Sequence, residues 1–357
     1  MKYRTLGRTG LYVSELCLGT MTFGGSADSD AGSSIGSLEQ DEVNRIVERA
    51  IEHGINFFDT ADGYSNGDSE RKLGQALKDL GVYRKDVVIA TKVGVRTGQG
   101  PNDEGASRTR IMDGIRGSLE RLQLDHIDLY QIHVDDSITP LDEILDALDD
   151  LVRRDLVRHV GVSNWPAWKI ATAHERQQAQ RQMPFASVQA HYSLPSRDLE
   201  REIIPLAEAT GIGIMVWSPL AGGLLSGKYE FGKEGEVTGE GRWAKRPFPP
   251  VDQARAKASV EVLRDIANAH GATVAQVALA WTLSRPQITS VIVGTRKLDQ
   301  LNDNVGAIGL TLTTDELARL DEVSQLPSEY PGWVLEFSGV TRDPNRLPSS
   351  NPRDEKA

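Results

Sequence analysis

The chain has 357 residues, of which 39% are hydrophobic, and its formal net charge is −11. This composition excludes a collagen-like or wholly disordered chain, and the acidic charge argues against nucleic acid or an anionic membrane as a partner. One cysteine, Cys17, excludes an internal disulfide. With no apolar run of membrane-spanning length and no apolar segment near the N-terminus, the sequence predicts a cytoplasmic protein.

Short apolar runs alternate with amphipathic segments along the chain. The runs rich in β-branched residues predict strands at 15–18, 55–58, 87–91, 127–132, 158–162, 186–189, 213–217 and 290–293. The segments between and after them predict helices at 41–53, 69–80, 108–122, 140–152, 166–176, 198–209, 251–270 and 297–305. Eight such alternations are typical of parallel strands joined by right-handed crossovers. They predict an α/β fold, a (β/α)8 TIM barrel, with a doubly wound open sheet as the alternative.

Several segments fall outside this alternation. Residues 3–13 predict a hairpin that caps one end of the barrel, and residues 273–283 predict an extra helix before the last strand. Long loops at 24–37, 94–107 and 221–250 follow predicted strands, so we expect them at the C-terminal face, where barrels build their active sites. We therefore predict one barrel domain over residues 1–326 and a polar tail over 327–357.

Four polar residues lie at the carboxyl ends of three successive predicted strands. Asp59 and Tyr64 follow the second strand, Lys92 ends the third and His133 ends the fourth. A neighbouring ammonium stabilises a phenolate, so Lys92, oriented by Asp59, would lower the pKa of Tyr64. With His133 bound to a substrate oxygen, this set would polarise a carbonyl and give it a proton while a hydride arrives from elsewhere. It needs neither a nucleophile nor a metal.

Each of these residues taken singly also has a structural interpretation: a turn cap, loop packing, a solvated lysine or a core histidine. Their joint placement favours the catalytic one. Among the other histidines, only His191 follows a predicted strand at the same face.

Motifs along most of the chain resemble those of the aldo-keto reductases. They are GLYVSELCLGTMTFG, GINFFDTADGY, ATK, LDHIDLYQIH, GVSNW, VQAHYSL, WSPLAGGLLSGKY and VIVGTRKLDQLNDN, in family order up to about residue 326. The chain is most similar to the bacterial branch related to the potassium-channel β-subunits. The resemblance implies that Tyr64 donates the proton, that Lys92 and Asp59 lower its pKa, and that His133 orients the carbonyl.

The resemblance also implies a cofactor, NADPH or NADP+, along the mouth of the barrel. Ser163, Asn164 and Gln189 would bind its carboxamide, the segment from Trp217 its pyrophosphate and the segment from Gly294 its adenosine. The implied set is Gly19, Thr20, Met21, Asp59, Ser163, Asn164, Gln189, Trp217, Ser218, Pro219, Leu220, Gly222, Leu224, Lys228, Val293, Gly294, Thr295, Arg296, Gln300, Asp303 and Asn304.

The residues near the last predicted strand independently favour a phosphate. Gly294 allows close backbone approach, a helix N-terminus follows, and Arg296 and Lys297 add positive charge. A solvated surface pair is the alternative for these two cations. Many family members have arginine where this chain has Gln300, so NADH stays possible.

The substrate side of the site departs from the family pattern. His133 is followed here by Val134 and two aspartates, which predicts an altered wall. Beside Tyr64, we expect apolar walls from Met21, Phe23, Val134, Trp165 and Trp243. The substrate is a small carbonyl compound or alcohol, and its identity, the preferred direction and the oligomeric state stay open.

Other classes of protein fit less well. The segment 222–228 nearly matches a nucleoside-triphosphate loop but has Tyr229 where a short hydroxyl side chain is needed. No Rossmann glycine motif follows the first strand, and no cysteine–histidine group has zinc spacing. The serious alternative is a regulatory subunit that binds NADPH, senses redox state and turns over slowly.

Overall fold

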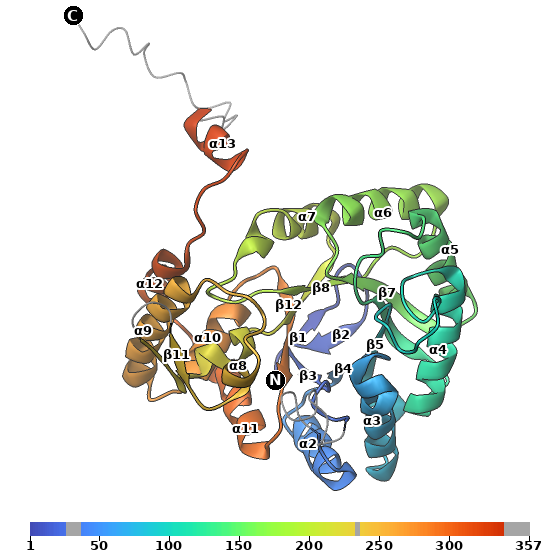
Figure 1. Ribbon diagram of the computed structural model, residues 1–357, viewed down its shortest axis with the longest axis horizontal. Coiled ribbons are helices and arrows are strands. Elements are labelled where there is room, and N and C mark those ends of the chain that lie inside the picture. The colour runs from blue at the N-terminus through green and yellow to red at the C-terminus, as the bar shows by residue number, and fades with distance from the viewer. Residues whose placement is uncertain (26–36, 233–235, 339–357) are drawn as a thin grey trace, which may run out of the picture. The chain divides into compact units, whose positions relative to one another are not determined.

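The structure is a computed structural model and describes residues 1–25, 37–232 and 236–338. Its centre is a closed barrel of parallel strands, which confirms the predicted (β/α)8 barrel over the open sheet (Figure 1). Around the barrel the order is β12, β3, β4, β5, β6, β7, β8 and β9. The strands are β3 (Leu16–Gly19), β4 (Phe57–Asp59), β5 (Val88–Val93), β6 (Ile127–Ile132), β7 (Val157–Ser163), β8 (Ser187–His191), β9 (Gly213–Trp217) and β12 (Ile288–Gly294).

Helices pack around the outside of this barrel (Figure 1). In chain order they are α2 (Gln40–Glu52), α3 (Asp68–Asp79), α4 (Arg108–Leu122), α5 (Leu141–Arg153), α6 (Ala167–Gln180), α7 (Ile203–Thr210), α9 (Gln253–His270), α10 (Val274–Leu283), α11 (Leu298–Gly306) and α12 (Thr314–Ser324). In α2 the residues Val43, Ile46, Val47 and Ala50 are buried, at the spacing of one helix face. Helix α12 was not predicted.

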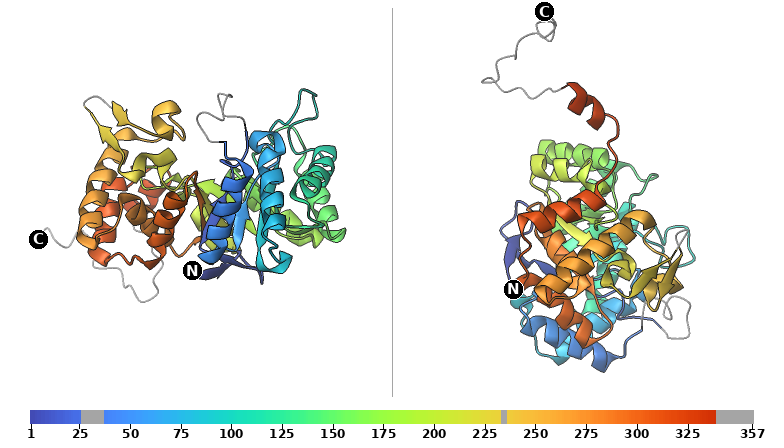
Figure 2. Two further views of the ribbon diagram at one scale, coloured as in Figure 1. Left: turned by 90° about the horizontal axis from the view of Figure 1, so that it is seen from below. Right: turned by 90° about the vertical axis from the view of Figure 1, so that its left-hand side faces the viewer.

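An N-terminal hairpin closes the barrel at the end opposite the long loops (Figure 2, left). Strands β1 (Tyr3–Thr5) and β2 (Tyr12–Ser14) pair antiparallel, which confirms the predicted cap. Leu6 and Val13 are fully buried in one cluster with residues of the barrel strands. The hairpin region therefore plugs the floor of the barrel and leaves its other end for a site.

The segment after β9, predicted as a long loop, contains secondary structure of its own. It contains η4 (Ala221–Ser226), β10 (Tyr229–Phe231), β11 (Val237–Gly239) and α8 (Arg242–Lys245). Strands β10 and β11 pair as a small antiparallel sheet. We call residues 221–250 the covering loop, because several of them line the cavity described below. Of the predicted loop 24–37, residues 26–36 lie outside the described residues.

The chain divides into two compact units, Met1–Ser324 and the residues from Gln325 onward. The first contains the barrel, its hairpin and its helices. Within the second, α13 (Gly332–Ser338) is a short helix with exposed Trp333, Leu335 and Phe337. In the part of the chain that the structure describes, no helix has both the length and the apolarity to cross a bilayer.

Candidate active site

The structure brings Asp59, Tyr64, Lys92 and His133 together at the carboxyl ends of β4, β5 and β6. The Lys92 ammonium donates to Asp59 Oδ2 at 2.5 Å, to the Thr60 carbonyl oxygen at 2.8 Å and to the Tyr64 hydroxyl oxygen at 3.1 Å. The Tyr64 and His133 rings meet edge to face, with centroids 5.6 Å apart. Three neighbouring strands thus converge on one phenol.

Lys92 is held in its charged form although it is fully buried. Burial alone would lower the pKa of this ammonium, but the Asp59 carboxylate and the Tyr64 hydroxyl reverse the effect, and the net pKa lies above its ordinary value. Asp59 is fixed in turn, since Gln189 Nε2 donates to Asp59 Oδ1 at 2.8 Å and Gln131 Nε2 at 3.3 Å. The positive charge beside Tyr64 is therefore permanent at neutral pH.

Tyr64 differs from the sequence-based expectation of a lowered pKa. Burial raises the pKa of its hydroxyl, the Lys92 charge opposes the rise, and Asp59 adds to it. The net direction is upward because desolvation of a phenolate costs more here than the ammonium returns. Tyr64 is consequently protonated at neutral pH, which is the state that a proton donor needs.

His133 is neutral at every physiological pH. Burial, with the charge of Lys92, lowers the pKa of its imidazole to about 3. Its buried Nδ1 has no hydrogen-bond partner among the described residues. Its backbone is fixed, because its N–H donates to the Val93 carbonyl oxygen at 2.8 Å and Asn164 Nδ2 donates to its own carbonyl oxygen at 3.0 Å. The ring offers a neutral polar nitrogen beside Tyr64.

A cavity of about 460 Å³ runs from these residues across the mouth of the barrel. Asp59, Tyr64 and His133 line it, and so do all the sequence-predicted cofactor residues except Leu224, which is fully buried. A side chain at Gly294 would meet no described atom nearer than 3.9 Å, so this glycine leaves the cavity open. The volume is in the range of small-molecule sites, roughly 300–1,000 Å³.

Trp217 forms an apolar wall at the Tyr64 end of this cavity. Its indole N–H donates to Asn164 Oδ1 at 3.0 Å. The His191 ring stacks on it at 4.6 Å, and Phe248 of the covering loop lies parallel to it at 6.0 Å. His191 itself does not line the cavity, and burial lowers its pKa to about 4. His191 therefore supports Trp217, while Phe248 is an aromatic wall that the sequence did not single out.

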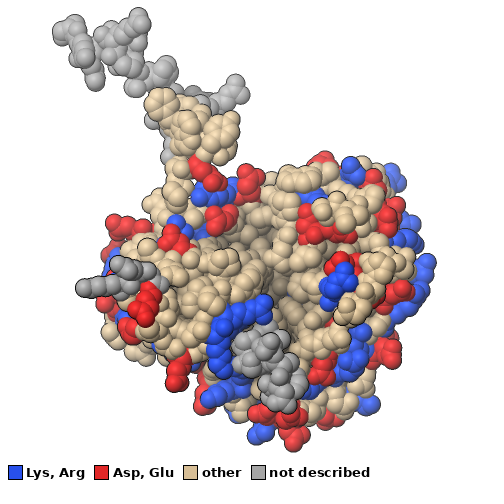
Figure 3. Space-filling view, viewed as in Figure 1, with Lys and Arg blue, Asp and Glu red and all other residues tan. Residues whose placement is uncertain are grey.

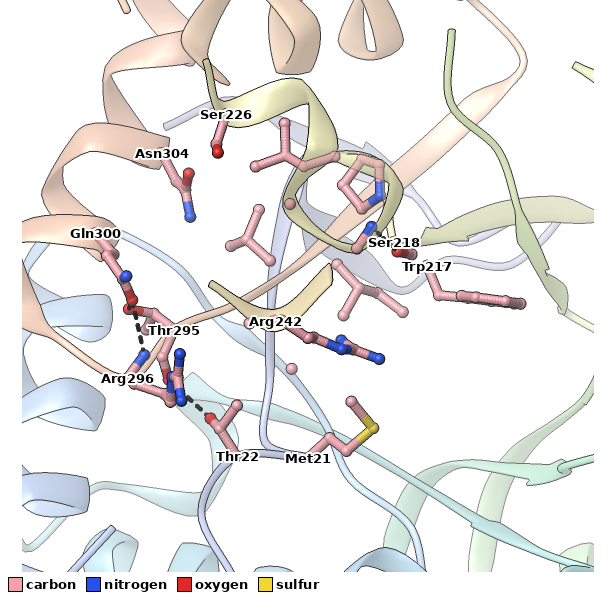
Figure 4. Close-up of a pocket in the computed structure, with 18 of the residues that line it drawn as sticks. Met21, Thr22, Trp217, Ser218, Ser226, Arg242, Thr295, Arg296, Gln300 and Asn304 are labelled. Carbon is pink, nitrogen blue, oxygen red and sulfur yellow. Dashed lines mark hydrogen bonds between the residues drawn. The ribbon is translucent and has the colours of Figure 1, made fainter. Parts of the chain in front are cut away.

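The other end of the cavity is basic and polar (Figure 4). Arg296 lies there with Gln300 and Asn304, and the Arg296 backbone N–H donates to Gln300 Oε1 at 3.1 Å. Helix α11 begins at Leu298 with no side-chain cap; the Gln300 N–H donates to the Lys297 carbonyl oxygen at 3.1 Å, and the N–H groups of Leu298 and Asp299 are those available to an anion. Basic side chains also gather at the rim of the hollow in Figure 3. On a protein of net charge −11, this is a local site for a negatively charged group.

Sequence reasoning missed Arg242, the first residue of α8. Its side chain points into the cavity from the covering loop (Figure 4). Its buried Nε has no hydrogen-bond partner among the described residues. Burial, with the charges of Arg246 and Arg296, lowers the pKa of this guanidinium below its ordinary value. The only sequence signal was a run of basic residues in the loop. The other lining residues not predicted are Thr22, Gly223, Ser226, Tyr229, Glu240, Gly241, Phe248, Ala275 and Ile292.

Of the residues predicted as apolar walls beside Tyr64, only Met21 lines the cavity. Val134 lies partly exposed outside it, whereas Phe23, Trp165 and Trp243 are buried and do not line it. Trp165 packs edge to face against Phe185. Trp243 lies inside the covering loop, where its backbone N–H donates to the Tyr229 hydroxyl oxygen.

The two aspartates after His133 form structural contacts. Asp135 pairs with Lys169, whose ammonium also donates to the Asp136 carbonyl oxygen at 2.8 Å. The Asp136 carboxylate accepts from the backbone N–H groups of Ala106 and Ile138. Neither aspartate lines the cavity. Across residues 1–25, 37–232 and 236–338, no group of three or more His, Cys, Asp and Glu side chains is placed to hold a metal ion.

The fold and the site together define a (β/α)8 barrel protein with a buried lysine beside a tyrosine at the wall of a cavity. The sequence profile of the Aldo/keto reductase family matches residues 15–325. An uncharacterized oxidoreductase of Bacillus subtilis (strain 168), YrpG, is 39% identical over 331 residues, which cover 90% of this chain and 96% of that protein. A probable voltage-gated potassium channel subunit beta of Oryza sativa subsp. japonica is 36% identical over 335 residues, covering 91% and 97%. A protein of the same name from Arabidopsis thaliana is 35% identical over 341 residues, covering 93% and 99%. The chain belongs to the aldo/keto reductase family of oxidoreductases.

Proposed function

We propose that the protein interconverts an aldehyde or ketone with the corresponding alcohol, using NADPH or NADP+. The observation that carries this proposal is the Lys92 ammonium, which contacts both Asp59 and the Tyr64 hydroxyl at the wall of the cavity. The substrate is a small molecule whose reactive oxygen reaches Tyr64. The membership of the family supports the reaction class, and NAD(P)H is its usual cofactor.

Tyr64 acts as the general acid in the direction of reduction. It is protonated at neutral pH because burial raises its pKa, and it gives this proton to the substrate oxygen. The phenolate that remains is stabilised by the ammonium of Lys92, 3.1 Å away. Neutral His133 orients the same substrate oxygen. In the direction of oxidation the phenolate takes the proton back.

The residues that line the cavity fit a nicotinamide dinucleotide phosphate. Arg242 offers an unpartnered Nε in the middle of the cavity, and Arg296 and the N-terminus of α11 offer positive charge at the far end. Ser163, Asn164 and Gln189 are the predicted partners of the nicotinamide end, and the segment that begins at Trp217 is the predicted partner of the pyrophosphate. When it is bound, the cofactor supplies hydride chemistry. Arg296 favours NADPH, and NADH stays possible because Gln300 carries no charge.

A second function is suggested by the names of the plant relatives, which are probable channel β-subunits. In this alternative the protein binds NADPH, turns over slowly and regulates a partner. The complete set of Tyr64, Lys92, Asp59 and His133 favours catalysis over that role.

The test is NADPH oxidation by the purified protein with a panel of aldehydes and ketones, beside Tyr64→Phe. We expect the variant to lose at least about a hundredfold in kcat, since a positioned general acid contributes roughly 10²–10⁴-fold. Tyr12→Phe is the control, because Tyr12 is an exposed tyrosine of the hairpin, remote from the cavity. The panel is repeated with NADP+ and alcohols.

Equal rates for Tyr64→Phe and the wild type would contradict the assignment of the proton donor. Tight NADPH binding without turnover in either direction would favour the regulatory function over catalysis.

A further inference from the structure

The turn that carries Tyr64 has an unfavourable backbone. Ser65 and Asn66 both lie in the left-handed region, with φ of 48° and 57°, and Gly67 follows with φ of 85°. Left-handed backbone is unfavourable for residues other than glycine, more so for Ser65 than for Asn66. Such a turn persists only where surrounding contacts over-determine it. Those contacts therefore decide where the Tyr64 hydroxyl lies.

On its N-terminal side the turn is anchored by Asp62. The Asp62 backbone N–H donates to the Lys92 carbonyl oxygen at 3.1 Å. Its carboxylate pairs with Arg110 of α4 at 2.5 Å, and both side chains are buried. Arg110 also donates to Thr97 Oγ1 at 3.2 Å, so it joins the turn to the loop after β5. The anchor is ionic and shielded from solvent.

Two glycines allow the turn to pack closely against the loop after β5 and against α4. A side chain at Gly63 would come within 2.1 Å of Val95, and one at Gly67 within 2.5 Å of Arg121. Arg121 pairs with buried Glu70 at 2.6 Å. Helices α3 and α4 pack against each other here, so both ends of the turn rest on α4.

We propose that Asp62 and Arg110 form a positioning pair, which transmits the position of α4 to the turn and holds the Tyr64 hydroxyl within reach of Lys92. Neither Asp62 nor Arg110 lines the cavity, so they act through Tyr64 and do not touch the substrate. This inference rests on the proposed function. A misplacement of a reacting group by about 1 Å costs on the order of a hundredfold in rate.

The pair predicts that kcat decreases on the acid side of its pH profile. Burial raises the pKa of Asp62 to about 6, and the Arg110 charge opposes the rise. The other charges that face Asp62 are Glu70 of α3 and Arg121 of α4, and the Tyr130 hydroxyl of β6 lies in the same group. As the pH falls through about 6, Asp62 is protonated and the ion pair is lost. The value of kcat should fall with it.

The test compares Asp62→Asn, Arg110→Gln and their double variant with the wild type. Arg108→Gln is the matched control, because Arg108 lies on the same helix in an exposed ion pair with Asp150. We measure kcat and KM for the best carbonyl substrate, the Kd of NADPH, and kcat from about pH 5 to pH 8. We expect kcat to fall at least about tenfold, and KM and Kd to stay within about threefold. The acid limb near pH 6 should be absent from Asp62→Asn. The double variant should lose no more than the singles, since all three remove one contact.

The proposal is overturned if folded Asp62→Asn keeps its wild-type kcat, if Kd rises as much as kcat falls, or if Arg108→Gln loses as much. Where a single variant does not fold because one charge is left buried, the double variant replaces it. Where that variant also fails to fold, Asp62→Glu replaces it, because it keeps the charge and lengthens the side chain that holds the turn, and a wild-type kcat for it overturns the proposal. Tyr64→Phe separates the two proposals. If Tyr64→Phe loses activity while Asp62→Asn keeps it, only the positioning pair is contradicted. If Tyr64→Phe keeps its activity, the proposed function is contradicted.

Discussion

Arg242→Gln should weaken NADPH binding without weakening the fold. Without the cofactor, Arg242 destabilises the fold, because its Nε is buried without a partner among the described residues and because other arginines lie near it. A phosphate of the cofactor would give this guanidinium a partner. Hydrogen bonds to charged groups contribute about 1.5–3 kcal/mol, which corresponds to roughly 10- to 150-fold in Kd. We therefore expect a Kd loss in that range.

The assay is a fluorescence titration with NADPH, since Trp217 lies in the cavity wall, together with thermal unfolding of the ligand-free protein. The control is Arg264→Gln, which removes an arginine of α9 that does not line the cavity but contacts the covering loop, through Glu230 at 2.8 Å and the Tyr229 carbonyl oxygen at 3.2 Å. The midpoint of unfolding should be unchanged or higher for Arg242→Gln. The increase in Kd should shrink at high salt, where screening weakens the contact in the wild type as well. A Kd within twofold of the wild type, or an equal loss in the control, would refute the reasoning.

Three further perturbations test other parts of the structure. Arg296→Gln should raise the Kd of NADPH roughly tenfold and leave that of NADH unchanged, because only NADPH has a 2′-phosphate; equal changes in both titrations would contradict this. Leu6→Ala should lower the free energy of unfolding by about 2–5 kcal/mol in denaturant titration, since Leu6 is fully buried in the barrel floor. As the pH rises from about 4 to 7, the free energy of unfolding of the wild type should fall by up to about 3 kcal/mol relative to that of Asp62→Asn. The reason is that a carboxyl with a raised pKa stabilises the fold below its unfolded pKa and loses this contribution as the pH passes the folded value of about 6. A difference between the two proteins that does not change with pH would contradict the raised pKa of Asp62.

The barrel and its phenol site could be predicted because they depend on local pattern. Strands β6 and β9 and helix α4 occupy the predicted ranges, and the ends of the other strands differ from the prediction by one or two residues. Polar residues at strand ends predicted the cluster of Asp59, Tyr64 and Lys92, since the register of parallel neighbours brings those ends together.

Other features could not be predicted because they depend on how distant segments pack. The placement of Arg242 in the cavity requires the covering loop to fold over the barrel, and no periodicity encodes that fold. Trp165 directly follows Asn164 and Trp243 directly follows Arg242, and both of these polar residues line the cavity. Tertiary contacts nevertheless bury the two tryptophans away from it. Helix α12 is different, because its signal was present: Thr313 and Glu316 form reciprocal side-chain to backbone hydrogen bonds at its start.

The groups proposed for chemistry and those proposed for binding stand on different parts of the fold. Asp59 and Lys92 lie on strands inside the barrel, where neighbouring ladders fix their positions. Arg242, by contrast, comes from the covering loop. A substitution that loosens this loop should therefore change Kd and leave kcat nearly intact, whereas one that disturbs β4, β5 or the Tyr64 turn should do the opposite. Asp62 does not line the cavity, yet it belongs with the groups proposed for chemistry, because its contacts are with Lys92 and with Arg110 beside the Tyr64 turn. With this division an acidic protein would bind the proposed anionic cofactor through positive charge supplied by loops around the mouth, while the strands need only keep one lysine charged.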